Sequence, residues 1–173
     1  MNTIYLISGP CGCGKSTLSN ELASIIDKSF LITGDELHNF FHGKDDIAWE
    51  DRLKITWQNI IAITQIALQN QLNIIIDYVV EEELPQLIEG LTGYDFELRY
   101  IVLVASEQTI KNRITARGDV ELINRAFFLR TKLMNSEENI PYLYDNNDKV
   151  LKEETEDILN DTRFIYRFRA SRL

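Results

Sequence analysis

Apolar runs alternate with helix-like segments along the whole chain. Short apolar runs, several rich in β-branched residues, are typical of buried parallel strands; they lie at Thr3–Ser8, Phe30–Thr33, Asn73–Val80 and Leu98–Val104, with a short fifth at Pro141–Asp145. Apolar residues spaced three and four apart predict helices over Ser16–Asp27, Ala48–Gln69, Glu81–Gly90, Glu107–Arg117, Val120–Glu138 and Lys152–Asn160. This alternation predicts an α/β fold with right-handed crossovers, in which helices cover both faces of a five-stranded parallel sheet.

Length and composition favour one globular domain spanning residues 1–173. The chain has 173 residues, of which 45% are hydrophobic and 26% charged. That length can bury a sizeable core, and no repeat or Pro/Gly/Ser-rich linker divides it. We therefore expect a three-layer fold that needs neither a metal nor a disulfide for its stability.

The net charge of −9 limits the possible partners. An acidic surface repels the phosphate backbone, which argues against a broad nucleic-acid-binding face. No run of about 18 apolar residues is present, so we expect no membrane span. The opening residues MNTIYLIS lack the basic region of a signal peptide, and we expect a cytoplasmic protein, either a monomer or a homodimer.

The stretch GPCGCGKS matches the phosphate-loop pattern G-x-x-x-x-G-K-[ST] at Gly9, Gly14, Lys15 and Ser16. It lies between a predicted strand and a predicted helix, which is the context that the pattern requires. Successive backbone N–H groups in such a loop form an anion-binding nest, and the start of the following helix adds its positive dipole end. The sequence therefore predicts a site for the phosphates of a nucleotide.

The residue types in the loop fit that chemistry. We expect Lys15 to reach the β- and γ-phosphates and the hydroxyl of Ser16 to bind Mg²⁺. Thr17 either binds the α-phosphate or caps the turn. The other loop residues would line the phosphates with their backbone, and glycine avoids a β-carbon that would block close approach; they are Cys11, Gly12 and Cys13.

The two cysteines, Cys11 and Cys13, both lie inside the loop. Two residues apart is a poor geometry for a disulfide. We expect both to be reduced, and a redox-sensitive nucleotide site is the alternative.

Asp77 ends the apolar run NIIID. The carboxyl ends of parallel strands face the ligand crevice, so this carboxylate is a candidate to orient Mg²⁺ directly or through water. The alternative is that Asp77 caps the next helix.

The pattern after the loop favours a small kinase over other phosphate-loop proteins. The D-x-x-G switch of GTP-binding proteins is absent, because Tyr78-Val79-Val80 follows Asp77, and Asn146-Asn147-Asp148-Lys149 does not fit their guanine motif N-K-x-D. A small kinase needs a phosphate loop, an acceptor pocket and a cationic lid, and the chain has candidates for all three.

Several motifs together resemble the small-molecule kinases of the gluconate kinase and shikimate kinase type, and chloramphenicol phosphotransferase-like proteins. The resemblance covers most of the chain and predicts the three-layer, nucleoside-kinase-like P-loop fold. Its motifs are GPCGCGKST, ITGDELH, Trp49-Glu50-Asp51, Ile55-Thr56-Trp57 and Ile76-Asp77-Tyr78.

The resemblance implies an acceptor site on the helices within residues 34–70. It implies that Asp35 contacts the hydroxyl to be phosphorylated; capping of a helix that starts at Glu36 is the alternative. His38 would contact the substrate or lie on the surface. Arg52 would bind an anionic or polyhydroxylated acceptor, or pair with an acid of its own helix. Of the two tryptophans, Trp49 and Trp57, either could wall this pocket, and Trp57 could equally be core.

A lid is expected within residues 107–138. Arg113 and Arg117 are four residues apart and share a helix face; in small kinases such arginines stabilise the charge of the transferred phosphoryl group. Two solvated arginines are the alternative. The aromatic lid segment of gluconate kinase is missing after this pair, which leaves the acceptor open.

The C-terminal stretch alternates aromatic and basic residues, with Phe164, Tyr166 and Phe168 between Arg163, Arg167, Arg169 and Arg172. This period of two predicts a strand or arm that packs its aromatic side on the domain. A dimer contact or a single-strand-binding arm are alternatives.

The sequence thus predicts an ATP- and Mg²⁺-dependent kinase that phosphorylates a hydroxyl of a small-molecule acceptor. A nucleotide, nucleoside or polynucleotide-end kinase is one alternative. A non-catalytic ATP-binding sensor is another.

Overall fold

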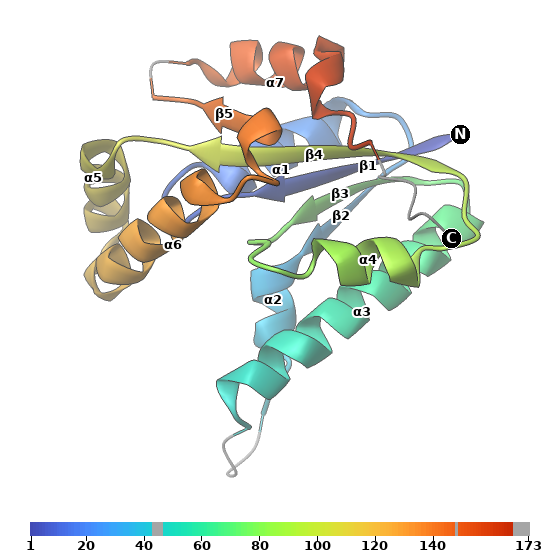
Figure 1. Ribbon diagram of the computed structural model, residues 1–173, viewed down its shortest axis with the longest axis horizontal. Coiled ribbons are helices and arrows are strands. Elements are labelled where there is room, and N and C mark those ends of the chain that lie inside the picture. The colour runs from blue at the N-terminus through green and yellow to red at the C-terminus, as the bar shows by residue number, and fades with distance from the viewer. Residues whose placement is uncertain (43–46, 148, 168–173) are drawn as a thin grey trace.

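A five-stranded parallel sheet forms the centre of the molecule (Figure 1). The computed structural model describes residues 1–42, 47–147 and 149–167. The strands are β1 (Asn2–Ser8), β2 (Ser29–Thr33), β3 (Asn73–Asp77), β4 (Phe96–Val104) and β5 (Leu143–Asp145), in the spatial order β2-β3-β1-β4-β5. All four strand pairings are parallel, which confirms the predicted fold class.

Helices connect the strands and cover the sheet on both sides (Figure 1). They are α1 (Lys15–Ile25), α2 (Gly34–His38), α3 (Trp49–Gln69), α4 (Leu84–Gly90), α5 (Glu107–Arg117), α6 (Ile123–Asn135) and α7 (Leu151–Asn160). Three short 3₁₀ turns join them, η1 (Val120–Leu122), η2 (Ile140–Tyr142) and η3 (Thr162–Phe164).

Successive side chains of each central strand enter opposite halves of the core, as the pleat of a strand requires. In β1, Ile4 and Leu6 pack with α3 and α4, whereas Tyr5 and Ile7 pack with α1 and α7. The near-continuous apolar runs of the sequence follow from this two-sided burial. Each fully buried isoleucine or leucine contributes about 1.5–3 kcal/mol relative to its exposed state, so the core fixes the sheet firmly behind the loops.

The register brings the carboxyl ends of three strands together. Asp77 of β3 lies opposite Ile7 of β1 and Thr33 of β2. The phosphate loop leaves β1 at Ser8 and α2 leaves β2 at Thr33. Three functionally predicted segments therefore meet at one edge of the sheet, as is usual for ligand sites of open α/β sheets.

The third strand is shorter than the pattern indicated. It ends at Asp77 and not at Val80, because the following residues turn toward β1: the Tyr78 N–H donates to the Ile7 carbonyl (3.3 Å) and the Val80 N–H donates to the Ser8 hydroxyl oxygen (2.9 Å). Helix α4 correspondingly begins at Leu84 and not at Glu81. Before it, the Glu83 carboxylate accepts hydrogen bonds from the backbone N–H groups of residues 81 and 82.

Two further boundaries differ from the prediction. The expected helix Val120–Glu138 is divided into η1 and α6, and α6 ends at Asn135. The expected strand Pro141–Asp145 begins at Leu143, because Pro141 lies in the 3₁₀ turn η2. Proline cannot donate a hydrogen bond to a neighbouring strand, so a turn suits it better than a sheet interior.

The C-terminal segment packs on the domain without forming a strand. Phe164 is fully buried in η3, and Ile165 makes one isolated antiparallel bridge to Arg99 of β4. The Tyr166 N–H donates to the Leu98 carbonyl, and its hydroxyl donates to Glu138. Phe168, Arg169 and Arg172 lie outside the described residues.

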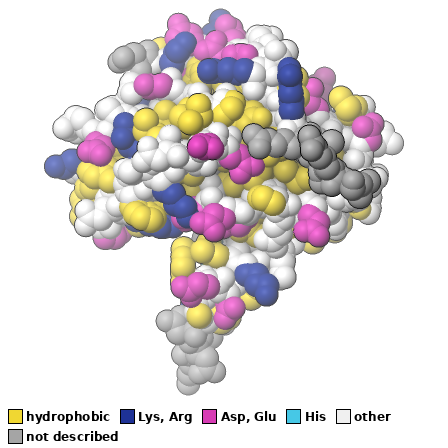
Figure 2. Space-filling view, in the orientation of Figure 1, with side chains coloured by type: hydrophobic (Ala, Val, Ile, Leu, Met, Phe, Trp, Pro, Cys, Tyr) yellow, Lys and Arg dark blue, Asp and Glu magenta, His cyan; other side chains and the backbone are white. Residues whose placement is uncertain are grey.

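The surface is charged with both signs. Figure 2 shows acidic and basic side chains interspersed on the face that it presents, over both the sheet and the helices. Among the described helices, none is long and apolar enough to cross a bilayer.

Candidate functional site

The phosphate loop, residues 9–14, requires glycine at two positions for reasons of backbone and packing. Gly9 has φ +143°, and a β-carbon there would lie 2.6 Å from the Leu103 carbonyl oxygen. Gly12 has φ +80°, and a β-carbon there would lie 2.8 Å from Cγ1 of Ile114 in α5. Both positions are therefore closed to other residues by the protein itself, in addition to any phosphate. The sequence predicted glycine here for the ligand alone.

Helix α1 begins at Lys15 without a side-chain cap. Its N-cap is Gly14 in the left-handed conformation, and the first N–H groups of a helix have no intrahelical acceptor. Ser16 and Thr17 are exposed in this first turn. These amides and the helix dipole make the turn a site for an anion.

Lys15 lies half-buried beside this turn. Its Nζ donates to the Pro10 carbonyl at 3.3 Å. Burial by itself lowers the pKa of the Lys15 amine, but attraction to the acidic groups of Cys13, Asp77 and Asp35 outweighs it and holds the pKa above its ordinary value. The amine is therefore a fixed positive charge at neutral pH.

Asp77 faces Lys15 and Ser16 from the end of β3. Only 4% of its surface is exposed. Burial raises the pKa of the Asp77 carboxyl, while Lys15 and a hydrogen bond from Ser16 lower it in part. The structure thus brings together the predicted phosphate and metal residues. Asp77 is the last residue of β3, whereas the N-cap of α4 is Glu83, so Asp77 does not cap that helix.

Asp35 lies in the first turn of α2, and its carboxylate is exposed. The helix begins at Gly34 with Thr33 as N-cap, and no side chain caps it; the alternative that Asp35 caps a helix starting at Glu36 is therefore wrong. The negative charge of Asp35 acts on Lys15, Asp77 and His38. Asp35 follows β2 at the carboxyl edge of the sheet, the same edge at which the phosphate loop leaves β1.

His38 is held by two aromatic neighbours. A 2.5 Å hydrogen bond joins its Nε2 to the hydroxyl of Tyr78, and its ring stacks on Trp49 at 5.3 Å with 6° between the planes. Burial lowers the pKa of His38, which Asp35 only partly opposes, and burial raises that of Tyr78. These contacts hold the imidazole against Tyr78 and Trp49, so His38 is not a free surface residue.

The two tryptophans have different surroundings. Trp57 is buried in the core against Tyr78. Trp49, at 55% exposure, lies at the start of α3, where its ring stacks on His38. Arg52, one turn later, donates from Nε to the Ile47 carbonyl at 3.0 Å and lies over the ring of Phe41 at 5.7 Å.

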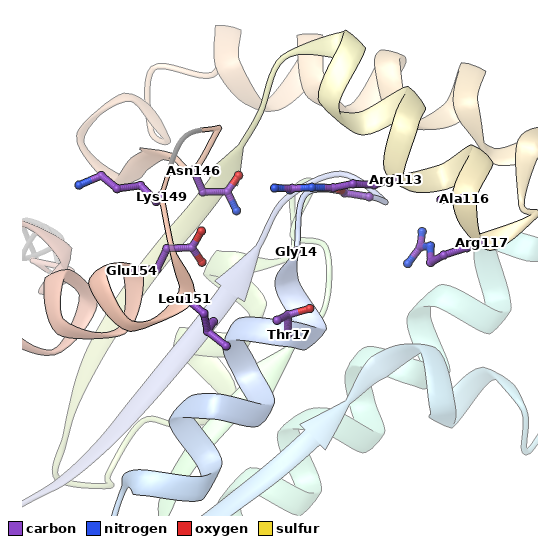
Figure 3. A pocket seen from close by; sticks show the side chains of 10 residues that line it. Gly14, Thr17, Arg113, Ala116, Arg117, Asn146, Lys149, Leu151 and Glu154 are labelled. Atoms are coloured by element: carbon purple, nitrogen blue, oxygen red, sulfur yellow. The ribbon is translucent and has the colours of Figure 1, made fainter.

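The two arginines of α5 contact the phosphate loop, which rules out a pair of merely solvated side chains. Arg113 donates from Nη1 to the carbonyls of Cys13 (3.2 Å) and Gly12 (3.5 Å). Arg117 donates from Nη2 to the Cys11 sulfur at 3.2 Å and pairs with Asp119 at 3.5 Å. Figure 3 shows Arg113 directed across the top of the loop and Arg117 to the right of it. Cys11 and the buried Cys13 are both free thiols.

A pocket of ≈ 490 Å³ opens beside the loop, and the sequence did not indicate it. The arginine side of α5 forms one wall and the segment around the start of α7 forms the other (Figure 3). From that second wall the side chain of Asn146 donates to the Cys13 carbonyl at 2.7 Å. The one available signal was the position of Asn146 at the carboxyl end of the fifth strand.

The oxygen atoms around Lys15 suit a magnesium ion. The Ser16 hydroxyl lies beside the phosphate turn and interacts with the Asp77 carboxylate, which helps to lower the pKa of that carboxyl. Mg²⁺ prefers one or two such oxygen ligands together with phosphate oxygens and water. Among the described residues no cluster of three or more His, Cys, Asp or Glu forms an all-protein metal site, and a nucleotide-bound magnesium does not need one.

Known protein families and solved structures are similar to this chain. A family profile described as an AAA domain matches residues 6–128. A search of curated protein sequences gave no match.

Solved structures share the fold over nearly the whole chain. The tunicamycin resistance protein of Deinococcus radiodurans is 16% identical, with 91% of this chain and 94% of that chain covered and a TM-score of 0.66. The APS kinase CysC of Mycobacterium tuberculosis, solved with AMPPNP and APS, is 14% identical, with coverages of 92% and 98% and a TM-score of 0.67. A gluconokinase of Sinorhizobium meliloti is 18% identical, with coverages of 91% and 89% and a TM-score of 0.57. These likenesses confirm the P-loop kinase fold and the resemblance to small-molecule P-loop kinases.

Proposed function

Because the chain belongs to the AAA domain family AAA_18, whose phosphate loop it carries intact, we propose that it transfers the γ-phosphoryl group of a nucleoside triphosphate to a hydroxyl of a small molecule. One observation carries the proposal: Lys15, Asp77 and Asp35 interact electrostatically with one another beside the uncapped start of α1. A phosphate site, a metal-ligand site and an acceptor-aligning acid are thereby available around one point.

The donor phosphates would bind the amides at the start of α1, with Lys15 along the β- and γ-phosphates. ATP is the donor that the sequence predicts. Ser16 and Asp77 would hold Mg²⁺, which when bound neutralises the developing charge on the phosphate oxygens. The chain's own contribution is a preformed positive turn that needs no rearrangement when charge shifts during transfer.

Asp35 would orient the acceptor hydroxyl opposite the γ-phosphate. The carboxylate is exposed. The helix that carries it follows Thr33, the residue paired with Asp77 in the sheet. Phosphoryl transfer depends mainly on positioning and on charge stabilisation, so alignment is the main task of Asp35, with removal of the proton as a smaller one.

The arginines of α5 would divide two tasks. Arg113 holds the loop carbonyls, so it would keep the loop in its binding conformation. Arg117 has the more exposed guanidinium, bound only to Cys11 and Asp119 among the contacts described, and would turn toward the transferred phosphoryl group. The lid within residues 107–138 would then close by movement of α5 and α6.

A nucleoside or nucleotide acceptor is a second candidate, supported by the aromatic side chains near Asp35. The ring of His38, three residues after Asp35, stacks on Trp49, and the ring of Phe40 is exposed nearby in the chain. Aromatic faces of this kind bind planar heterocycles by stacking. Arg52, close to Phe41, would contact an anionic group of the acceptor.

An acceptor screen tests the proposal. Purified protein is incubated with Mg²⁺, with ATP and GTP supplied in separate arms, and with panels of sugar acids, hydroxylated antibiotics and nucleosides; release of nucleoside diphosphate is measured. We expect one panel to stimulate release, and the Lys15→Ala variant to abolish it. Nucleotide binding without stimulation by any panel would instead favour a sensor.

A further inference from the structure

The pocket beside the phosphate loop is the place for the base of the bound nucleotide. This inference rests on the proposed function, because the phosphates at the start of α1 fix where the nucleoside lies. The loop residues Gly12 and Gly14 and the helix residue Thr17 form the floor of the pocket. Its walls come from α5 and from the segment before and within α7 (Figure 3). What the walls present therefore decides which base fits.

Asn146 presents an unpaired acceptor to this pocket. The residue is 2% exposed, and its Oδ1 has no hydrogen-bond partner among the described residues. The amide orientation is fixed, because its Nδ2 donates to the Cys13 carbonyl at 2.7 Å; a reversed amide would place two acceptors against each other. Buried polar atoms are nearly always paired, so a donor supplied by a ligand at this wall would satisfy Oδ1.

Glu154 presents a second acceptor from α7. It lines the same pocket and is 6% exposed. Burial raises the pKa of its carboxyl, whereas Arg113, the amide of Asn146 and Lys149 lower it in part. A carboxylate has about four positions that accept hydrogen bonds, and the contact with Asn146 occupies one. Figure 3 shows the Glu154 and Asn146 side chains close together on one wall, facing Arg113.

We propose that Glu154 and Asn146 make the base pocket selective for guanine over adenine. The Watson–Crick edge of guanine carries two adjacent donors, N1–H and N2–H₂, which match the Glu154 carboxylate and the Asn146 Oδ1. Adenine carries the acceptor N1 in the corresponding position, so the carboxylate would face another acceptor. The guanine O6 would accept from Arg113 or Lys149, the cations on the two walls.

This recognition is independent of the guanine motif of GTP-binding proteins, which the chain lacks. It uses a glutamate of α7 in place of the aspartate of that motif. A site that is built to pair hydrogen-bond donors rejects an analogue that lacks them more strongly than a site that only fits its shape. We therefore expect GTP to bind at least about tenfold more tightly than ATP, which corresponds to one well-formed additional hydrogen bond.

The test is a titration of GTP, ATP and xanthosine triphosphate against the wild-type chain and the Glu154→Gln variant by calorimetry. Xanthine carries a carbonyl at C2 in place of the amine. The Glu154→Gln amide can donate to that carbonyl, so this variant should bind GTP at least about tenfold more weakly and the xanthine nucleotide more tightly. Glu153→Gln, an exposed neighbour on the same helix, is the matched control and should change neither affinity.

The outcomes separate this inference from the proposed function. Preference for GTP together with the exchange of preference in Glu154→Gln supports the inference. Equal binding of GTP and ATP, or tighter ATP, by the wild-type chain overturns it and leaves the kinase proposal standing; this comparison needs no variant to fold. Failure to bind any of the three nucleotides overturns the proposed function itself.

Discussion

At the scale of single residues, the site depends on opposite charges held at short range by burial. The Lys15 amine keeps its proton because Asp77 and Asp35 are nearby, although burial alone would favour the neutral form. Asp77 is buried while Asp35 is exposed. The two carboxylates therefore suit different tasks. Asp77 suits the binding of a metal, and Asp35 suits a contact with a second substrate.

Replacement of Asp35 should separate catalysis from nucleotide binding. We expect Asp35→Asn to lower kcat by about 10²–10⁴-fold, the usual contribution of a positioned acid or base, while the dissociation constant of the nucleotide stays within about threefold of wild type. Steady-state release of diphosphate and calorimetric nucleotide titration measure the two quantities. Glu36→Gln, the exposed neighbour in α2, is the control; a parallel loss of binding in Asp35→Asn would refute the assigned task.

The two arginines of α5 should respond differently to the same substitution. Arg113→Gln removes two hydrogen bonds to loop carbonyls, so we expect mainly weaker nucleotide binding. Arg117→Gln removes an exposed guanidinium, so we expect mainly a kcat that is lower by about 10³-fold or more. Comparing kcat with the nucleotide dissociation constant for both variants tests the division. Identical profiles for the two variants would contradict it.

At the scale of elements, the periodic segments were predictable and their ends were not. The core strands and α3 are long and strongly patterned, and each was found within a few residues of its predicted position. The end of β3 depends on a hydrogen bond that the Val80 N–H donates to the side-chain oxygen of Ser8, 72 residues away. The start of α4 depends on the Glu83 carboxylate. Such contacts are made by folding and leave no periodic trace.

The candidate site likewise contains residues that the sequence predicted and residues that it did not. The phosphate loop is a local motif, so the sequence identified it completely, and Asp77 followed from its place at a strand end. Asn146 and Glu154 come close to the loop only because β5 lies beside β4 in the sheet. In the sequence, residues 146–149 were only a poor match to a guanine motif, and the hydrogen bond from Asn146 to the Cys13 carbonyl could not be predicted.

The junction between β1 and β3 gives a prediction about stability. Ser8 is fully buried and its hydroxyl accepts from the Val80 N–H at 2.9 Å. We expect Ser8→Ala to lower the free energy of unfolding by about 1–3 kcal/mol, because the buried amide loses its acceptor. Urea unfolding measures the change. Ser24→Ala, at an exposed position of α1, is the control, and a Ser8→Ala variant as stable as this control would contradict the account.

At the scale of the whole molecule, the acidic net charge of −9 and the mixed surface of Figure 2 favour small anionic ligands held in a local basic site. The positive groups Lys15, Arg113 and Arg117 all border the phosphate loop. Elsewhere several cations are paired with acids, as Lys132 is with Glu81 and Glu82. We therefore expect the molecule to attract phosphates at this loop without attracting a polyphosphate backbone along its surface.

Binding of oligonucleotides should accordingly be weak. We expect a fluorescent single-stranded 20-mer to bind at about 150 mM salt no more tightly than nonspecific binders, with dissociation constants of about 10⁻⁴ M or weaker. Fluorescence anisotropy over a series of salt concentrations measures it. Tight binding with a steep salt dependence would transfer support to the polynucleotide-end kinase.

The central claim is that the uncapped start of α1 and Lys15 bind the phosphates of a nucleotide. A crystal structure with magnesium and a non-hydrolysable nucleoside triphosphate tests it most directly. The account predicts the β- and γ-phosphates on the amides that follow Gly14, within hydrogen-bond distance of Lys15 Nζ, with the metal beside Ser16 and Asp77. Phosphates bound elsewhere, with this turn left without an anion, would contradict it.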